Sequence, residues 1–327
     1  MNFGTGRVAG YAPRRAADAA GITEAARLIR DGGLVAFPTE TVYGLGADAT
    51  NAAAIAQVYA AKGRPSFNPL IAHVADPETA MREGMFSAAA QDLAERFWPG
   101  PLTLVVPVAE ASRVSDLARA GLRSVGLRVP AHPVARALLA EVDRPVAAPS
   151  ANRSGHVSPV SADHVIDDLA DKIDLVLDGG PCDVGIESTI VACLDDRPRL
   201  LRPGGIAREQ IEEVLGARLA VIDGRAAGGP IAPGMLASHY APRAALRLDA
   251  TTLEPGEAGL DFGGRFAPGE HVLDLSPRGD TVEAAANLYS YLRRLDVSGA
   301  DAIAVAPIPP EGLGEAIRDR LKRAATR

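Results

Sequence analysis

The chain has 327 residues, of which 47% are hydrophobic and 23% are charged, and its formal net charge is −7. This length exceeds the usual size of a single hydrophobic core, so the sequence predicts two domains. The negative charge argues against nonspecific nucleic-acid binding over the whole surface, and no apolar run is long enough for a transmembrane helix. Residues 1–20 lack the apolar core of a signal peptide, so a cytoplasmic protein is expected.

Helix and strand signals alternate over the first two-thirds of the chain. Apolar spacing and flanking caps predict helices over 21–33, 51–61, 87–97, 132–142, 161–173 and 208–216. Short aliphatic and β-branched runs predict strands over 34–38, 70–74, 102–108, 124–129, 144–149, 174–180 and 188–194. Such interleaving predicts an α/β domain over residues 12–217.

The composition changes after this domain. Residues 218–243 are rich in Gly, Pro and Ala and are predicted to form a linker. The linker also carries His239 and Tyr240, which are unusual on a passive tether, so we expect residues 233–242 to fold over the catalytic cavity as a lid. Residues 244–327 read as β–β–α–β–α, a small α/β domain in which no glycine-rich dinucleotide fingerprint follows a strand.

Three polar clusters follow predicted strands or helices, where open α/β sheets place ligands. The first is PTETVYGLG, residues 38–46, which is either a binding loop or a plain turn. In the second, Lys62 and Arg64 precede two prolines and could clamp a polyphosphate, or could simply complement a helix C-terminus. The third, PSANRSGHVSP at residues 149–159, offers many hydrogen-bonding groups.

The clusters indicate nucleotide phosphates but no familiar catalytic motif. Only three lysines occur against 31 arginines, so a lysine in a cluster is less easily explained as surface solubility. No P-loop motif is present, and Cys182 and Cys193 have no metal-ligand spacing. The residues alone therefore predict a phosphate-binding α/β protein of a nonclassical kind.

Taken together, the clusters resemble the YrdC/Sua family of threonylcarbamoyl-AMP synthases in its longer, two-domain form. The matching segments are FPTETVYGLG, AKGRPSFNPLIAH, FWPGPLTLV, VGLRVPAHPVA, APSANRSG, ESTIV and LRPG, in that order, followed by PGMLASHYAP. The resemblance implies a twisted mixed β-sheet enclosing a basic cavity and a small C-terminal Rossmann-like α/β domain.

The resemblance also implies a role for individual residues. The residues expected to contact ATP are Lys62, Arg64, Asn68, Ser124, Ser150, Asn152, Ser158, Arg202, His239 and Tyr240. Those expected to contact threonine are Thr41, His73, Arg128, Ala148 and Ser188. Lys62 and Arg64 are the expected catalytic pair, and Arg128 is expected to meet the threonine carboxylate.

The reaction implied joins ATP, L-threonine and bicarbonate into threonylcarbamoyl-AMP for tRNA modification, with Mg²⁺ held by ATP phosphates rather than by protein side chains. The expected partners are the proteins that transfer the threonylcarbamoyl group to tRNA, with tRNA bound at most indirectly. Two alternatives remain: a carbamoyltransferase of the hydrogenase-maturation type, which would need further cysteine-rich modules, and an RNA-binding module.

Overall fold

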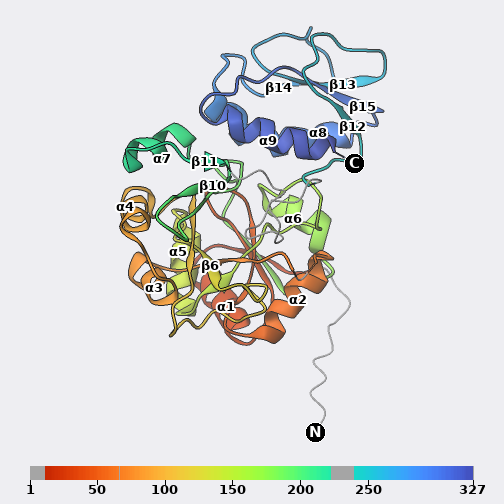
Figure 1. Ribbon diagram of the computed structural model, residues 1–327. Helices are drawn as coiled ribbons and strands as arrows, with labels where there is room; N and C mark the ends of the chain where they lie inside the picture. Colours follow the sequence, from red (N-terminus) through yellow and green to blue (C-terminus); the bar gives the residue numbers. More distant parts are fainter. Residues whose placement is uncertain (1–11, 66, 222–238, 327) are drawn as a thin grey trace.

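A computed structural model describes residues 12–65, 67–221 and 239–326. Within them the chain forms two units, each built on its own β-sheet (Figure 1). The large unit contains an 11-stranded mixed sheet, and the small unit contains a four-stranded sheet whose paired strands are all parallel. This architecture confirms the predicted α/β fold with a twisted mixed sheet and a second, smaller α/β layer.

The large sheet has the strand order β1-β8-β2-β3-β7-β4-β6-β5-β9-β10-β11. Its strands are β1 (Arg14–Ala16), β2 (Val35–Phe37), β3 (Gly44–Asp48), β4 (Ile71–His73), β5 (Leu102–Pro107), β6 (Ser124–Arg128), β7 (Val146–Ala147), β8 (Leu175–Asp178), β9 (Thr189–Ala192), β10 (Arg199–Arg202) and β11 (Ala220–Val221). Its helices are α1 (Ala19–Arg30), α2 (Ala52–Lys62), α3 (Pro77–Glu83), α4 (Ala88–Phe97), α5 (Pro133–Val142), α6 (Ala162–Leu169) and α7 (Arg208–Leu215).

The helices of the large unit begin and pack as their sequences dictate. The side chains of Asn51 and Ser87 cap α2 and α4 by accepting backbone N–H hydrogen bonds, as predicted. The apolar face of α1 packs against α5, where Ile29 and Leu138 are fully buried in one core cluster. Each such side chain contributes about 1.5–3 kcal/mol through burial, so this helix pair fixes one layer of the unit.

The sequence did not predict β1, β3, β10, β11 or α3 in the large unit. Strand β3 is the most informative omission, because it begins inside the PTETVYGLG cluster and pairs antiparallel with β2. Its Gly46 lies against the ring of Phe37, and a Cβ there would fall 2.8 Å from a ring carbon. Two of the five residues of β3 are glycines, which lowers the strand propensity of this segment. The close packing against Phe37 nevertheless requires a glycine at position 46.

The small unit has the strand order β12-β15-β13-β14. Its elements are β12 (Ala245–Arg247), β13 (Glu257–Asp261), β14 (Val272–Asp274), α8 (Thr281–Asp296), β15 (Ala302–Val305) and α9 (Gly314–Ala325). The predicted β–β–α–β–α order was wrong by one strand, because the acidic and glycine residues of β13 have low strand propensity. Both helices lie on the face of this sheet that is turned toward the large unit (Figure 1).

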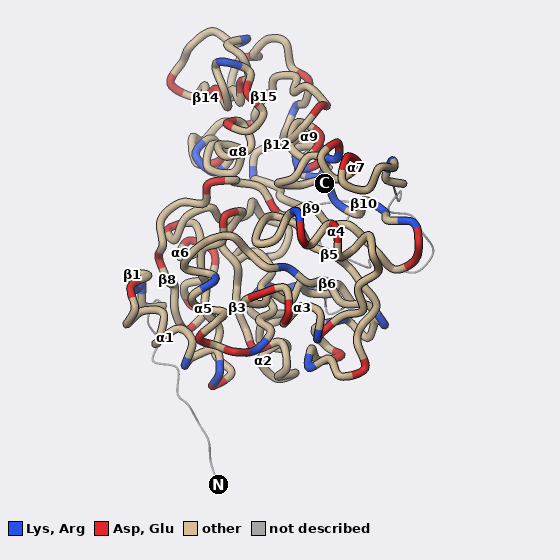
Figure 2. The backbone as a smooth tube through the Cα atoms, turned by 90° about the vertical axis from the view of Figure 1, so that its left-hand side faces the viewer, with Lys and Arg blue, Asp and Glu red and all other residues tan. Residues whose placement is uncertain are grey.

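Charged residues of both signs are interspersed along the loops and helices of both units (Figure 2). None of the described helices is long and apolar enough to cross a membrane. The predicted division at residues 12–217, 218–243 and 244–327 stays a prediction, because residues 222–238 lie outside the described part of the chain.

Candidate active site

A small polar cavity of about 50 Å³ lies in the large unit at the ends of several strands. It is lined by Thr41, Val42, Arg64, Ile71, Arg128, Pro149, Ser150, Glu187, Ser188, Arg202, His239 and Tyr240. Eight of the predicted site residues are therefore brought together here, from segments more than 190 residues apart. The segments meet because β3, β7, β4, β6, β5, β9 and β10 are consecutive neighbours in the sheet.

Backbone hydrogen bonds join two of the predicted clusters into one wall. Tyr43 N–H donates to Pro159 O at 2.9 Å, and Ala151 N–H donates to Tyr43 O at 2.8 Å. Within the first cluster, the Thr39 hydroxyl donates to Val42 O at 2.6 Å and lies 2.8 Å from the Thr41 hydroxyl. The PTETVYGLG segment is thus a tightly hydrogen-bonded loop, of which Thr41 and Val42 line the cavity.

Lys62 occupies a different position from the one its spacing suggested. It is the last residue of α2, and the following Gly63 adopts a left-handed conformation, so Lys62 and Arg64 are not on one side of an extended loop. The buried Lys62 Nζ donates to Ser150 O at 2.5 Å, Asn152 O at 2.6 Å and Asn152 Oδ1 at 3.3 Å. Lys62 therefore holds the 150–152 loop in shape and is not a cavity-lining residue.

Burial, followed by the nearby Arg64 charge, lowers the pKa of Lys62 well below its usual value. Three oxygen acceptors nevertheless match the three donors of an ammonium group, whereas a neutral amine has only two. The hydrogen-bond geometry thus favours the charged form and offsets part of its desolvation.

Three buried arginines supply the positive charge that lines the cavity: Arg64, Arg128 and Arg202. Each is fixed by backbone carbonyls. Arg64 donates to Pro69 O at 3.1 Å, Arg128 to Gly100 O at 3.3 Å, and Arg202 to Ser188 O at 2.8 Å. Each also keeps an Nη1 without a hydrogen bond to any described residue, so fixed donors remain for an anionic ligand.

Burial lowers the pKa of Arg64 to about 10, and burial also lowers that of Arg202, so both stay charged at neutral pH. Arg128 has a carboxylate partner as well, because its Nη2 lies 2.7 Å from Glu40 Oε1 and both side chains are buried. This ion pair fixes the orientation of the Arg128 guanidinium.

Glu187, the one carboxylate among the cavity-lining residues, was not among the predicted site residues. Burial by itself would raise the pKa of Glu187, but Arg320, Arg202 and a hydrogen bond from Ser158 outweigh burial and hold it at about 2. The sequence does contain one indication of Glu187: it is an acidic residue that directly follows Ile186 and comes just before a predicted buried strand. An acid at such a position is almost never left unpaired.

His239 and Tyr240 cover one side of the cavity, and their rings meet edge to face at 4.1 Å. Burial, more than the nearby Lys62 and Arg64 charges, lowers the pKa of His239 to about 3, so its ring is neutral, and its Nδ1 is buried without a partner. The predicted lid spans residues 233–242, of which 233–238 lie outside the described residues. The described part is anchored by Ala241 N–H donating to Gly155 O at 2.8 Å.

Seven predicted site residues lie around the cavity without lining it: Lys62, Asn68, His73, Ser124, Ala148, Asn152 and Ser158. His73 is paired with Arg128 across β4 and β6 and is buried. Ser158 is buried and donates to Glu187 at 2.6 Å. Ser124 is the most distant, because it begins β6 while Arg128 ends it, a separation of about 13 Å along the strand.

The described residues contain no group of three or more His, Cys, Asp or Glu side chains arranged to hold a metal ion. The one lining carboxylate, Glu187, already accepts hydrogen bonds from Ser158, Tyr289 and Arg320. Three fixed arginines line the cavity, so its charge suits an anionic group such as a phosphate or a carboxylate.

Two family models together cover most of the chain. Residues 27–204 match the Sua5, YciO and YrdC model, which is described as "Telomere recombination". Residues 206–326 match the model described as "Threonylcarbamoyl-AMP synthase, C-terminal domain".

Curated proteins and a solved structure are similar over nearly the whole chain. The chain is 43% identical to the threonylcarbamoyl-AMP synthase of Bacillus subtilis, over 93% of this chain and 92% of that protein. It is 42% identical to that of Pyrococcus abyssi, over 92% and 93%. The crystal structure of P. abyssi Sua5 complexed with L-threonine matches with a TM-score of 0.86 at 39% identity, covering 96% of this chain and 97% of that one.

Proposed function

This chain belongs to the YrdC/Sua family of threonylcarbamoyl-AMP synthases, and from that premise we propose that it makes threonylcarbamoyl-AMP and pyrophosphate from ATP, L-threonine and bicarbonate. The observation that carries the proposal is the convergence of Arg64, Arg128 and Arg202 on one buried cavity, each fixed by backbone carbonyls. Fixed cations suit the three anion-bearing substrates, ATP, threonine and bicarbonate, better than flexible surface lysines would.

The reaction needs two bond-forming steps. The threonine amine first adds to bicarbonate, with loss of water, to form N-carboxy-threonine. A carboxylate oxygen of this carbamate then attacks the α-phosphorus of ATP, and the bond to the β-phosphate oxygen breaks so that pyrophosphate leaves with the electron pair. The attacking oxygen is already anionic, so no strong general base is required. Positioning and charge neutralisation are the main tasks of the protein.

Arg128 suits the threonine carboxylate. Glu40 and Gly100 hold two of its nitrogens, so the remaining Nη1 has a defined direction toward the ligand. Arg64 and Arg202 remain for the phosphates of ATP, since both line the same cavity. We expect Mg²⁺ to enter with ATP, where it would neutralise charge on the leaving pyrophosphate.

The rings of His239 and Tyr240 cover one side of the cavity. We expect them to close over the bound substrates, which would exclude water from an adenylate that hydrolyses easily.

The product is an activated acyl group, which a downstream transferase must consume. We propose that proteins of tRNA modification receive it in the cytoplasm and that tRNA does not enter this cavity. The net charge of −7 supports this, because nucleic-acid binding over an extended surface usually requires an excess of basic residues.

Pyrophosphate release tests the proposal. In a reaction without RNA, release should require ATP, threonine and bicarbonate together. Serine should replace threonine less well, by about 10–200-fold, since the two differ by one methyl group. Release without threonine or bicarbonate would indicate an ATP hydrolase instead, and RNA binding without any release would favour the RNA-binding alternative.

A further inference from the structure

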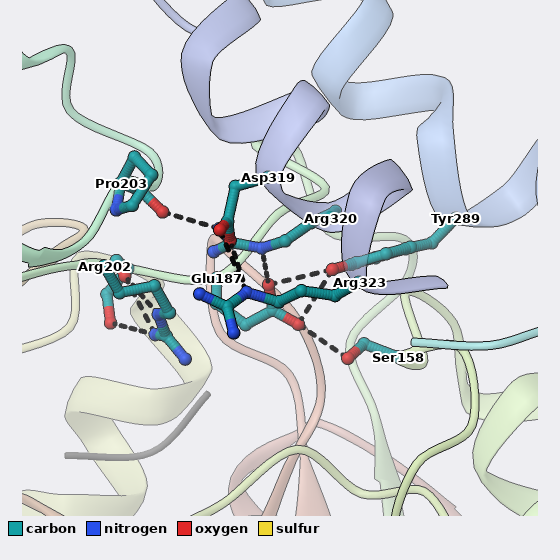
Figure 3. A network of polar contacts seen from close by, with 9 residues as sticks. Ser158, Glu187, Arg202, Pro203, Tyr289, Asp319, Arg320 and Arg323 are labelled. Carbon is teal, nitrogen blue, oxygen red and sulfur yellow. Dashed lines mark hydrogen bonds and ion pairs between the residues drawn. The ribbon is translucent and has the colours of Figure 1, made fainter. Parts of the chain in front are cut away.

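A buried polar cluster joins the small unit to the cavity (Figure 3). We call Glu187, Ser158, Tyr289 and Arg320 the Glu187 cluster. Glu187 lines the cavity, while Tyr289 lies on α8 and Arg320 on α9. Tyr289 Oη lies 2.9 Å from Glu187 Oε2, and Arg320 Nε lies 2.9 Å from the same oxygen. Both side chains are completely buried.

Tyr289 and Arg320 also contact Tyr240, which covers one side of the cavity. The Tyr289 ring stacks on the ring of Tyr240 with centroids 5.8 Å apart. The Arg320 guanidinium lies over the Tyr240 ring at 5.4 Å and also donates to Pro203 O at 2.6 Å. The small unit therefore contacts three walls of the cavity from behind: Glu187, Tyr240 and the turn that follows Arg202.

The backbone also approaches closely at this interface. A Cβ on Gly185 would lie 2.5 Å from the Cα of Ala286 on α8, and Gly185 has a φ of +75°. The segment that carries Glu187 is therefore pressed against α8 and has little freedom to shift. An interface that only carried a tether would not need such contact.

The bonds of Glu187 restrict what Ser158 can do. Ser158 Oγ donates its single proton to Glu187 Oε1 at 2.6 Å. A serine hydroxyl has one proton and two lone pairs, so while this bond holds, Ser158 can only accept from a ligand. Phosphate oxygens of ATP also only accept. Ser158 is buried next to the cavity-lining Glu187 and does not itself line the cavity. A ligand group that reaches its oxygen must therefore be a donor, such as a ribose hydroxyl or the adenine amino group of the nucleoside.

We propose that Glu187 is a positioning residue for the nucleoside part of ATP, held in place by Tyr289 and Arg320, so that the small unit completes the ATP site of the large unit. This inference rests on the proposed function for the identity of the ligand. It assigns the small unit a direct part in substrate affinity, in addition to carrying the segment that covers the cavity.

Tyr289→Phe is the sharpest test, because it removes the hydroxyl and keeps the stacked ring. It should raise the KM for ATP about five- to tenfold, since a bond to a charged group is lost. The kcat and the KM for threonine should stay within about twofold. Ser158→Ala should have a similar effect, and Tyr289→Phe should add almost nothing in the Ser158→Ala background, because both act through the same contact.

Two controls separate positioning from general weakening of the interface. Arg208→Met breaks the ion pair between Arg208 and Glu315, which also joins the two units but lies away from the cavity, and it should leave the KM for ATP unchanged. Inorganic tripolyphosphate should inhibit wild type, Ser158→Ala and Tyr289→Phe equally, because it lacks a nucleoside.

Several results would overturn the inference. One is an unchanged KM for ATP in Tyr289→Phe, and another is an equal rise in Arg208→Met. Multiplicative effects in the double variant, or a parallel loss of tripolyphosphate inhibition, would show that Tyr289 does not act through Ser158 on the nucleoside. Thermal unfolding of each variant verifies that it is folded.

Calorimetry with Mg²⁺–ATP distinguishes failure of this inference from failure of the proposed function. If the wild-type protein binds Mg²⁺–ATP but releases no pyrophosphate, the proposed function fails while a weaker affinity in Tyr289→Phe alone still supports the positioning role. If the wild type does not bind Mg²⁺–ATP, the inference fails with it.

Discussion

The two units contribute to one cavity in opposite ways. The large unit supplies side chains that face the cavity, among them Arg64, Arg128 and Arg202, each held by the unit's own backbone carbonyls. The small unit supplies Tyr289 and Arg320, which do not line the cavity but hold a residue that does. The large unit thus provides the groups proposed to contact substrate, and the small unit provides groups that hold a cavity-lining side chain in place. Substitutions can test that separation.

The largest effect is expected at the cations that face the cavity. Arg202→Ala should reduce adenylate formation at least about tenfold and up to about 150-fold, because a charge-assisted phosphate contact contributes ~1.5–3 kcal/mol. Steady-state pyrophosphate release measures the loss. The matched control is Arg199→Gln. Arg199 lies on the same strand as Arg202 and forms an ion pair with Asp195, so this variant should stay within about twofold of wild type. Equal losses in both variants would mean that Arg202 does not act at the cavity.

The second prediction concerns a cation of the large unit that serves structure. Lys62→Met should lower the free energy of unfolding by about 2–4 kcal/mol, because three oxygens of the 150–152 loop lose their buried donor. Activity should fall as well, because the substitution leaves the 150–152 loop without its fixed shape. Urea unfolding tests this directly. A variant with unchanged stability and strongly reduced activity would instead make Lys62 a phosphate ligand.

The third prediction separates the two substrates within the large unit. Arg128→Ala should weaken threonine binding about tenfold or more and ATP binding much less, since Arg128 is assigned to the threonine carboxylate. Glu40→Gln should show the same preference more weakly, because it loosens the Arg128 guanidinium without removing it. Calorimetry with each ligand measures both constants. An equal loss of affinity for threonine and ATP would refute the assignment.

The effect that is smallest at neutral pH is expected from His73, because it changes only the pH dependence of stability. Burial, and then the Arg128 charge, lowers the pKa of His73 to about 3, against about 6.5 for an unfolded chain. Between these values the unfolded state binds the additional proton, so stability should fall as the pH drops from about 6.5 toward 3. His73→Gln should flatten the slope by about 1.4 kcal/mol per pH unit. His271→Gln, at an exposed position, is the control, and identical slopes in all three proteins would contradict the prediction.

Eight of the predicted site residues line the large-unit cavity, and several of them follow strand ends in short contiguous motifs. Thr41, Arg64 and Ser150 could be selected from loops beside predicted strands, and the sheet order then brought them together. The hydrogen bonds of Lys62 could not be predicted, and its predicted contact with ATP stays a prediction. Its partners are carbonyls 88–90 residues away, and carbonyl direction leaves no trace in residue type.

Apart from Ser158, the residues of the Glu187 cluster escaped prediction for a related reason. Tyr289 and Arg320 lie on two helices whose sequences are ordinary amphipathic patterns, and nothing local distinguishes a buried arginine from a solvated one. Only the packing of α8 and α9 against the large unit gives these residues a common partner. The strand β13 was missed for a similar reason. Its pairing with β15 and β14 overrides the weak strand propensity of its own sequence.

Both units are proposed to serve one reaction, the condensation of bicarbonate, threonine and ATP in the shared cavity. Mass spectrometry of the products from ¹³C-bicarbonate, ¹⁵N-threonine and ATP tests this most directly. The full chain should form an adenylate that carries both labels, and Arg202→Ala should reduce its amount in step with pyrophosphate release. An adenylate lacking either label, or AMP alone, would contradict it.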